Sequence, residues 1–185
     1  MSSTGEYLFR DSYILRGIDV KNLVIINGTM GVGKTATCRE LQKILPQNVF
    51  LDGDWCWDMT PFTVTEETKA MVMDNISYLL NNFIRCSEYE NIIFCWVMHE
   101  QWIIDELLSR LDLGSCTAKI FSLTADCESL KSRLNKDVAN GMRTKDIIQR
   151  SISRIKKYDC LNTEKIDVSK ISPKQAAEAV SARIL

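Results

Sequence analysis

The sequence predicts an α/β fold in which helices cover both faces of a mainly parallel sheet. Short apolar runs typical of buried strands alternate with longer segments whose apolar residues recur at helical intervals. No internal repeat interrupts this alternation, and the chain contains only three prolines. Strands that alternate with helices form parallel sheets, because each crossover carries a helix onto one face. We therefore expect a three-layer α/β/α sandwich with its site at the carboxyl ends of the strands.

The length of 185 residues suits one domain. Apolar runs predict strands at Leu23–Asn27, Val49–Leu51, Ile92–Met98 and Ala118–Thr124, and a weaker one near Lys165–Val168. Helical spacing predicts helices at Lys34–Leu45, Glu66–Cys86, Gln101–Leu111, Glu128–Val138, Lys145–Lys157 and Pro173–Leu185. Residues 1–21 do not fit the alternation and form an N-terminal extension, either an added strand or a tail.

The composition argues against nucleic acid and membranes as binding partners. The net charge of −1 provides no global attraction for nucleic acid, and no apolar run reaches the roughly 18–20 residues that span a bilayer. Charged residues within the first twenty argue against a signal peptide. The seven cysteines are odd in number and form no C-x-x-C pair, so we expect free thiols in a reducing cytoplasm. The oligomeric state is left open.

A phosphate-binding motif follows the first predicted strand. Its pattern is G-x-x-x-x-G-K-T, and its residues are Gly28, Thr29, Met30, Gly31, Val32, Gly33, Lys34 and Thr35. Glycines permit a tight loop whose amides point inward at an anion, and the next helix adds its positive end. Lys34 is suited to the β- and γ-phosphates, and the Thr35 hydroxyl to Mg²⁺. We expect this P-loop to bind ATP or a related triphosphate.

Two acids, Asp52 and Asp54, flank a glycine at the end of the second predicted strand. Carboxylates this close are costly unless a cation or a substrate hydroxyl stabilises them. One would reach the Mg²⁺ shell while the other accepts a proton or hydrogen bond from an acceptor hydroxyl. The alternative is a solvated acidic turn, since Asp-Gly is common in turns.

These residues resemble a known family. The P-loop with Leu51-Asp52-Gly53-Asp54, and the run Ile166–Pro173, are similar to the small P-loop kinases that include gluconate, shikimate and adenylylsulfate kinases and chloramphenicol phosphotransferase. The resemblance spans residues 22–185 and implies a P-loop NTPase fold with sheet order 2-3-1-4-5. It implies that Asp52 helps to hold Mg²⁺ through water and that Asp54 orients the acceptor or acts as its base. The backbone after the last strand, at Ser169 and Pro173, would skirt adenine.

The third strand departs from other P-loop proteins. It ends in Val97-Met98-His99-Glu100 and lacks the aspartate of a typical Walker B strand. That absence argues against a motor or switch NTPase. Glu100 is the one feature that favours simple hydrolysis, because it could position water.

Residues 133–145 are predicted to form a lid, with a break at Asn140-Gly141. Arg143, just past the break, would stabilise charge on the transferred group as the loop closes. Arg133 could stack on adenine, as a corresponding arginine does in similar kinases. The alternative is an ordinary pair of exposed helices with solvated basic residues.

Three groups of residues are candidates for the acceptor pocket. Trp55 and Trp57 could form its aromatic wall, and His99 is the only histidine of the chain. Arg150 and Arg154 would share a helix face, suited to an acceptor that carries phosphate or carboxylate. Core packing of the tryptophans, a bystander histidine and a solvated basic face are the alternatives.

The function that these observations favour is an ATP-dependent kinase of a small metabolite, nucleoside, nucleotide or antibiotic. Lys34, Asp54 and Arg143 would be its catalytic residues, and Thr35 and Asp52 its metal ligands. A P-loop ATPase or switch that acts on a partner protein is one alternative. A kinase of polynucleotide ends is the other, disfavoured by the near-neutral charge.

Overall fold

The computed structural model describes residues 21–184, and the predicted N-terminal extension, apart from Lys21, lies outside them. Five parallel strands form one sheet in the order β2-β3-β1-β4-β5, which confirms the expected topology. The strands are β1 Asn22–Gly28, β2 Asn48–Asp52, β3 Asn91–Trp96, β4 Thr117–Thr124 and β5 Glu164–Asp167. The central strand, β1, pairs with β3 on one side and with β4 on the other.

Six α-helices and one short 3₁₀ helix accompany the sheet in the described part of the chain. They are α1 Lys34–Ile44, η1 Gly53–Trp57, α2 Glu66–Arg85, α3 Gln101–Ser109, α4 Cys127–Ala139, α5 Asp146–Asp159 and α6 Pro173–Ser181. The alternation of strands and helices did not predict η1. Within residues 21–184 every helix is too short or too polar to cross a membrane.

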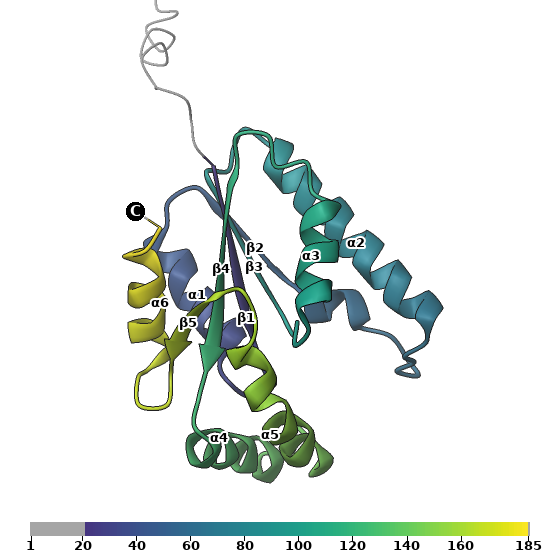
Figure 1. The fold of residues 1–185 in the computed structure, drawn as a ribbon, viewed down its shortest axis with the longest axis vertical. Helices are drawn as coiled ribbons and strands as arrows, with labels where there is room; N and C mark the ends of the chain where they lie inside the picture. Colours follow the sequence, from purple (N-terminus) through teal and green to yellow (C-terminus); the bar gives the residue numbers. More distant parts are fainter. Residues whose placement is uncertain (1–20, 185) are drawn as a thin grey trace, which may run out of the picture.

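The helices divide between the two faces of the sheet (Figure 1). On one face, α1 and α6 cover a core that contains Val24 and Ile26. On the other, α2 and α3 cover a second core that contains Leu23 and Ile25. These four residues of β1 are fully buried, and each such side chain contributes about 1.5–3 kcal/mol through burial. The helices α4 and α5 pack together at the carboxyl end of the sheet.

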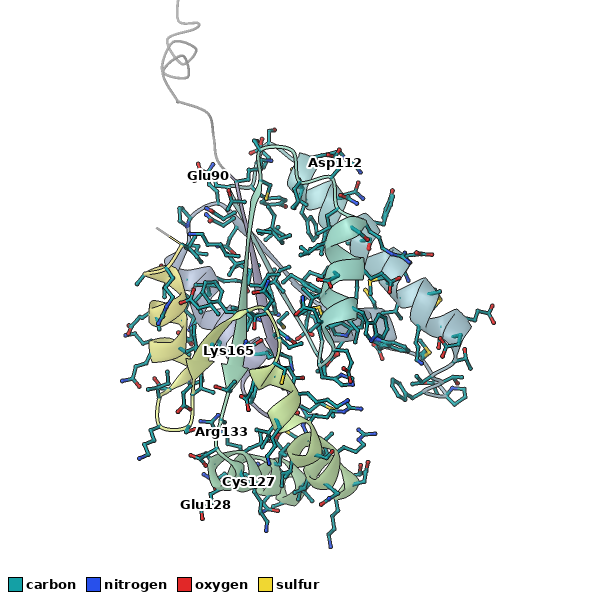
Figure 2. The ribbon with its side chains drawn as sticks, viewed as in Figure 1. Glu90, Asp112, Cys127, Glu128, Arg133 and Lys165 are labelled. Carbon is teal, nitrogen blue, oxygen red and sulfur yellow. The ribbon has the colours of Figure 1, made fainter. Side chains whose placement is uncertain are left out.

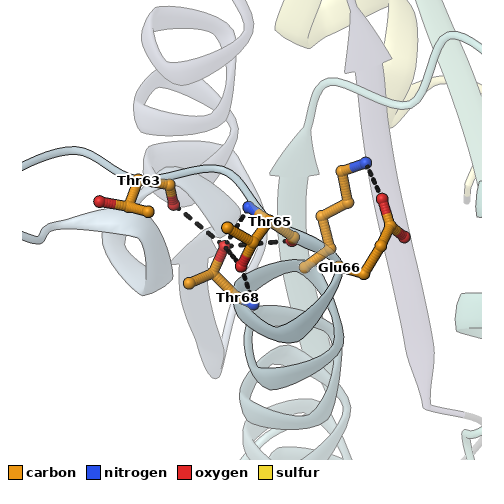
Figure 3. A network of polar contacts seen from close by, with 5 residues as sticks. Thr63, Thr65, Glu66 and Thr68 are labelled. Carbon is orange, nitrogen blue, oxygen red and sulfur yellow. Dashed lines mark hydrogen bonds and ion pairs between the residues drawn. The ribbon is translucent and has the colours of Figure 1, made fainter.

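A capping box fixes the start of α2 and therefore the end of the segment that follows β2. The Thr65 Oγ1 accepts a hydrogen bond from the Thr68 amide at 3.2 Å, and the Thr68 Oγ1 accepts one from the Thr65 amide at 2.9 Å. The Thr68 hydroxyl also lies 3.0 Å from the Thr63 carbonyl oxygen (Figure 3). These bonds satisfy amides that the first turn of a helix leaves without partners.

The predicted lid, residues 133–145, comprises the end of one helix and the connection to the next. The helix α4 continues through Ala139, close to the predicted end at Val138, so Arg133 lies on a helix as expected and residues 140–145 connect α4 to α5. Gly141 has a positive φ of 70° in this connection, which agrees with the expected break at Asn140-Gly141.

Asn27 connects three strands at the carboxyl end of the sheet. Its Nδ2 donates to the Met98 carbonyl at 2.8 Å and to the Ser122 Oγ at 3.3 Å. Its Oδ1 accepts from the amides of Gly28 and Met98, both at 2.8 Å. The side chain is fully buried, and every one of its polar atoms is paired. Asn27 therefore ties the first residue of the P-loop to the segment that follows β3.

We expect the substitution Asn27→Leu to lower the free energy of unfolding by about 3–5 kcal/mol, because it leaves several buried polar groups without hydrogen-bond partners. Asn22→Leu is the matched control at the other end of β1, where one side-chain bond to Asn91 is lost and about 1 kcal/mol is expected. Urea unfolding measures both values. Equal losses in the two variants would contradict the role given to Asn27.

Candidate functional site

The P-loop connects β1 to α1 and leaves an open cradle at the start of the helix. Gly31 and Gly33 have φ angles of 78° and 107°, which residues with a Cβ rarely adopt. A Cβ on Gly31 would come within 2.4 Å of Leu134, whereas one on Gly33 would meet no atom within 4 Å. Gly31 therefore allows α4 to approach, and Gly33 turns amides toward open space, as an anion nest requires.

Lys34 brings a buried positive charge to this cradle. Its side chain is only 8% exposed, and the Nζ atom lies 3.2 Å from the Thr29 carbonyl oxygen. Burial lowers the pKa of Lys34, while the nearby Cys95, Asp54 and Asp52 oppose that effect. Among the described residues no carboxylate forms an ion pair with it. The ammonium group is therefore suited to receive an anion from outside the chain.

Thr35 and Asp52 meet across the gap between α1 and β2. The Thr35 hydroxyl donates to the Asp52 Oδ2 at 2.7 Å, and the Asp52 Oδ1 accepts from the Asp54 amide at 3.1 Å. Asp52 is buried, and its side chain caps η1. A hydroxyl next to a buried carboxylate supplies the oxygen donors that Mg²⁺ prefers. The two residues predicted to serve the metal are thus adjacent and chemically suitable.

Asp54 lies at the start of η1, within electrostatic reach of two predicted catalytic residues. Its side chain reaches solvent, yet the protein beneath it removes part of its hydration and raises the pKa of its carboxyl group. Lys34 and Arg143 lower this pKa, and Asp52 raises it. Arg143 itself pairs with Asp137 at 3.2 Å. The structure therefore brings Lys34, Asp54 and Arg143 to one region.

Arg133 projects from α4 toward the segment that follows β5 (Figure 2). Its guanidinium donates to the carbonyl oxygens of Val32, at 3.1 Å, and of Val168. A cavity of about 260 Å³ opens beside it, lined by Val32, Gly33, Thr37, Arg133, Val168, Ile171, Ser172, Pro173 and Ala176. This mainly apolar cavity borders the P-loop, as a nucleobase pocket would. Pro173 lines it, whereas the Ser169 side chain turns away to the Asp126 amide at 2.8 Å.

The helix α5 carries Arg150 and Arg154, which differ in their surroundings. Arg150 is exposed, and its guanidinium lies 3.7 Å from Asp146 and 3.9 Å from the Met30 sulfur of the P-loop. Arg154 is half-buried and acts electrostatically on His99. The first arginine therefore lies beside the predicted donor site, and the second beside the segment after β3.

The two tryptophans predicted to share a pocket lie in different surroundings. Trp55 packs edge-on against Phe50 with ring centroids 5.4 Å apart, and the Arg39 guanidinium of α1 lies 5.6 Å from its ring. Trp57 packs on the core under α2 and α3, with its ring 5.9 Å from that of Phe62. Trp57 therefore packs on the core that contains Met98, the residue before His99, whereas Trp55 contacts residues of β2 and α1.

Gly53 is a site residue whose role the sequence did not reveal. A Cβ on this glycine would come within 2.6 Å of the Trp96 ring, so its absence lets β3 approach the turn between Asp52 and Asp54. Asn27 was also missed, although one signal was present. It is a polar residue inside an apolar strand, next to the first P-loop glycine.

Comparisons with known proteins agree with this geometry. A family model described as AAA domain matches residues 24–155, whereas no curated protein sequence matches the chain. The tunicamycin resistance protein of Deinococcus radiodurans has 20% identity and a TM-score of 0.64, over 89% of this chain and 95% of that one.

Two further solved structures are similar. A gluconokinase from Sinorhizobium meliloti 1021 has 15% identity and a TM-score of 0.64, over 89% and 94% of the chains. Shikimate kinase from Acinetobacter baumannii, in complex with shikimate, has 17% identity and a TM-score of 0.59, over 90% and 94%. The chain therefore belongs to the AAA domain family and has the fold of the small P-loop kinases.

Proposed function

We propose that this protein is an ATP-dependent kinase that transfers the γ-phosphoryl group to a hydroxyl or phosphate of a small molecule. One observation carries the proposal: an accessible carboxylate, Asp54, lies within electrostatic reach of both the P-loop Lys34 and Arg143. A nucleotide switch or ATPase would need a group that activates water instead. The residue after β3 that the sequence suggested for this task, Glu100, is engaged by Lys157 of α5. The gluconokinase and shikimate kinase among the similar folds support the same choice.

The donor would bind with its phosphates on the P-loop amides and Lys34, and with its base in the cavity beside Arg133 and Pro173. Thr35 and Asp52 would hold Mg²⁺, which supplies charge neutralisation between the donor phosphates when it is bound. Burial strengthens the attraction between Lys34 and these phosphates, because little water competes for the ammonium group.

Asp54 would align the acceptor hydroxyl and take its proton. As the acceptor oxygen bonds to the γ-phosphorus, the bond from that phosphorus to the β–γ bridging oxygen breaks and ADP departs with the electron pair. The raised pKa of Asp54 suits it to receive the proton. Arg143 would exchange Asp137 for the transferred group when residues 140–145 move, which is the role expected of a lid.

We expect Gly33→Ala to weaken binding of a non-hydrolysable ATP analogue by about tenfold or more, because an alanine at φ 107° strains the amide nest. Gly114→Ala is the matched control, since Gly114 has a positive φ of 50°, open space where a Cβ would lie, and a place far from the P-loop in sequence. Calorimetric titration should show a changed Kd in the first variant only. A similar change in both would indicate a general loss of folding.

We expect Asp54→Asn to reduce kcat by about 10²-fold or more while the Kd for ATP stays within about twofold, because the variant loses only the proton acceptor. ADP release is measured over nucleosides, nucleotides, sugar acids, and aminoglycoside- and phenicol-like compounds. Asp58→Asn, an exposed acid after η1, serves as the control and should keep its turnover. Full turnover by Asp54→Asn would exclude the assigned role.

The same substitution should stabilise the nucleotide-free protein at neutral pH. The folded-state pKa of Asp54 is raised, so its ionisation costs stability at any pH above that value. The cost disappears as the pH falls below the ordinary carboxyl pKa, where Asp54 is protonated in both states. Thermal unfolding should therefore show a higher Tm for Asp54→Asn at pH 7 and no difference near pH 3. A lower Tm at pH 7 would contradict the raised pKa.

A further inference from the structure

The cavity beside Arg133 has the size of one ring system. Its volume of about 260 Å³ lies below the roughly 300–1,000 Å³ of pockets that hold whole drug-sized ligands. Residues of α1, α4, α6 and the segment between β5 and α6 line it, and it borders the P-loop at Gly33. In the proposed function this cavity receives the donor base, so its polar groups decide which base can bind.

The carbonyl oxygens next to Arg133 already have a partner within the protein. The Arg133 guanidinium donates to the carbonyl oxygens of Val32, at 3.1 Å, of Val168, and of Ser169, at 3.4 Å. These bonds connect the P-loop to the segment after β5. A base that enters the cavity therefore meets carbonyl oxygens that a cation of the protein already engages.

The start of α6 is paired in the same way. The Gln175 Oε1 accepts a hydrogen bond from the Ser172 amide at 2.9 Å and lies 3.0 Å from the Ser172 hydroxyl. Pro173, the next lining residue, has no amide hydrogen to donate. This side of the cavity therefore offers a base mainly apolar contact.

Thr37 of α1 differs from these residues. It is only 1% exposed, and it lines the cavity. Its amide donates to the Gly33 carbonyl at 2.9 Å, whereas its hydroxyl makes no hydrogen bond with any residue in the range 21–184. The Ser151 and Tyr158 hydroxyls are also unpaired, but the protein encloses them completely, and the Thr37 hydroxyl is not enclosed in this way. The accessible area that Thr37 retains is therefore on its hydroxyl, which opens to the cavity.

An unpaired hydroxyl at a buried position indicates a ligand that pairs with it, because buried polar groups nearly always have partners. A hydroxyl can both donate and accept. Adenine carries an amino group at position 6, and guanine carries a carbonyl oxygen at the same position. By rotation about its C–O bond, the Thr37 hydroxyl can accept from the first or donate to the second. The backbone of Ile171, which also lines the cavity, likewise offers one donor and one acceptor.

We propose that Thr37 is the side chain that pairs with the donor base, and that the cavity accepts adenine and guanine with similar affinity. This inference rests on the proposed kinase function, which would then use both ATP and GTP as donors. The lining imposes no fixed order of donors and acceptors that would exclude either purine. A pyrimidine buries less apolar surface in the same space, so UTP and CTP should bind more weakly.

Calorimetric titration in the presence of Mg²⁺ tests the choice of base. The probes are the β,γ-imido analogues of ATP, GTP and UTP, which carry the same charge. The Kd values of the ATP and GTP analogues should agree within about threefold, and the UTP analogue should bind about fivefold more weakly or worse. A preference of tenfold or more for one purine, or equal binding of the UTP analogue, would overturn the proposal.

Thr37→Val keeps the shape of the side chain and removes only the hydroxyl. It should raise the Kd of both purine analogues about five- to tenfold, and leave the Kd of inorganic tripolyphosphate, which has no base, unchanged. Thr117→Val, at the exposed start of β4, is the matched control and should change neither value. An unchanged Kd for the purine analogues would remove Thr37 from the site.

Two further outcomes of this titration would overturn the role of Thr37. An equal loss of affinity for the UTP analogue would place the hydroxyl at the ribose, which all three analogues share. An equal loss for tripolyphosphate would show that the hydroxyl supports the P-loop instead of the base.

Thermal unfolding of the nucleotide-free protein separates binding from folding. The Thr37 hydroxyl has no partner to lose, so the Tm of Thr37→Val should equal that of the wild type or exceed it. A lower Tm would show that the hydroxyl is paired within the protein and would contradict the proposal.

Turnover with each donor completes the test. For an acceptor that is phosphorylated, kcat/KM for ATP and for GTP should agree within about threefold. Transfer from ATP alone would overturn the use of GTP as a donor. Similar Kd values for both purine analogues, lost together in Thr37→Val, without phosphorylation of any acceptor would instead overturn the kinase function and support the role of Thr37.

Discussion

Burial of the central strand on both faces is the constraint on which the site depends. Strand β1 has no solvent-facing side, so every polar group at its carboxyl end needs a partner inside the protein. Asn27 provides that pairing by binding the Gly28 amide, the Met98 backbone and Ser122 together. The same bonds fix the P-loop relative to the segment that carries His99. Asn27 thus fixes the relative positions of the P-loop and the segment after β3, although it contacts neither substrate in the proposed function.

The charged side chains around the P-loop differ in how deeply they are buried. Lys34 and Asp52 are buried, whereas Asp54 reaches solvent. Asp52 has its negative charge satisfied by the Thr35 hydroxyl and the Asp54 amide. Asp54 has no comparable bonds in the described structure, and its pKa is raised. Two carboxylates separated by one glycine are therefore suited to different tasks, one to holding a cation and the other to exchanging a proton.

The apolar patterns were sufficient to locate the strands, and the family resemblance predicted their order in the sheet and the closeness of Thr35 and Asp52. Alternating apolar patterns located all five strands, because strands buried on both faces leave a clear apolar signal. The P-loop and the acid pair lie at the ends of β1 and β2, whose positions in a parallel sheet determine their approach. The catalytic and binding roles of these residues remain predictions, since the geometry describes positions and not turnover.

Side-chain direction was the part that the sequence did not determine. Trp55 and Trp57 are two residues apart, yet η1 turns one toward α1 and the other toward the core beneath α2. A 3₁₀ helix of five residues is too short to produce a periodic pattern in the sequence. The unpaired hydroxyls of Ser151 and Tyr158 were equally hidden, because pairing depends on what packs against a helix face and not on the residues of the helix alone.

The contacts of α5 suggest how the same fold could bind different acceptors. Its inner face contacts the P-loop through Ser151 and the β3–α3 segment through Lys157. In the proposed function, the donor would depend on backbone amides and Lys34, which the loop geometry fixes, whereas the acceptor would meet side chains of α5. Under this proposal, changes at Arg154 would alter acceptor binding without disturbing the amide nest. The proposed function therefore implies that selectivity for the acceptor could change on this helix while the fold and the donor site stay the same.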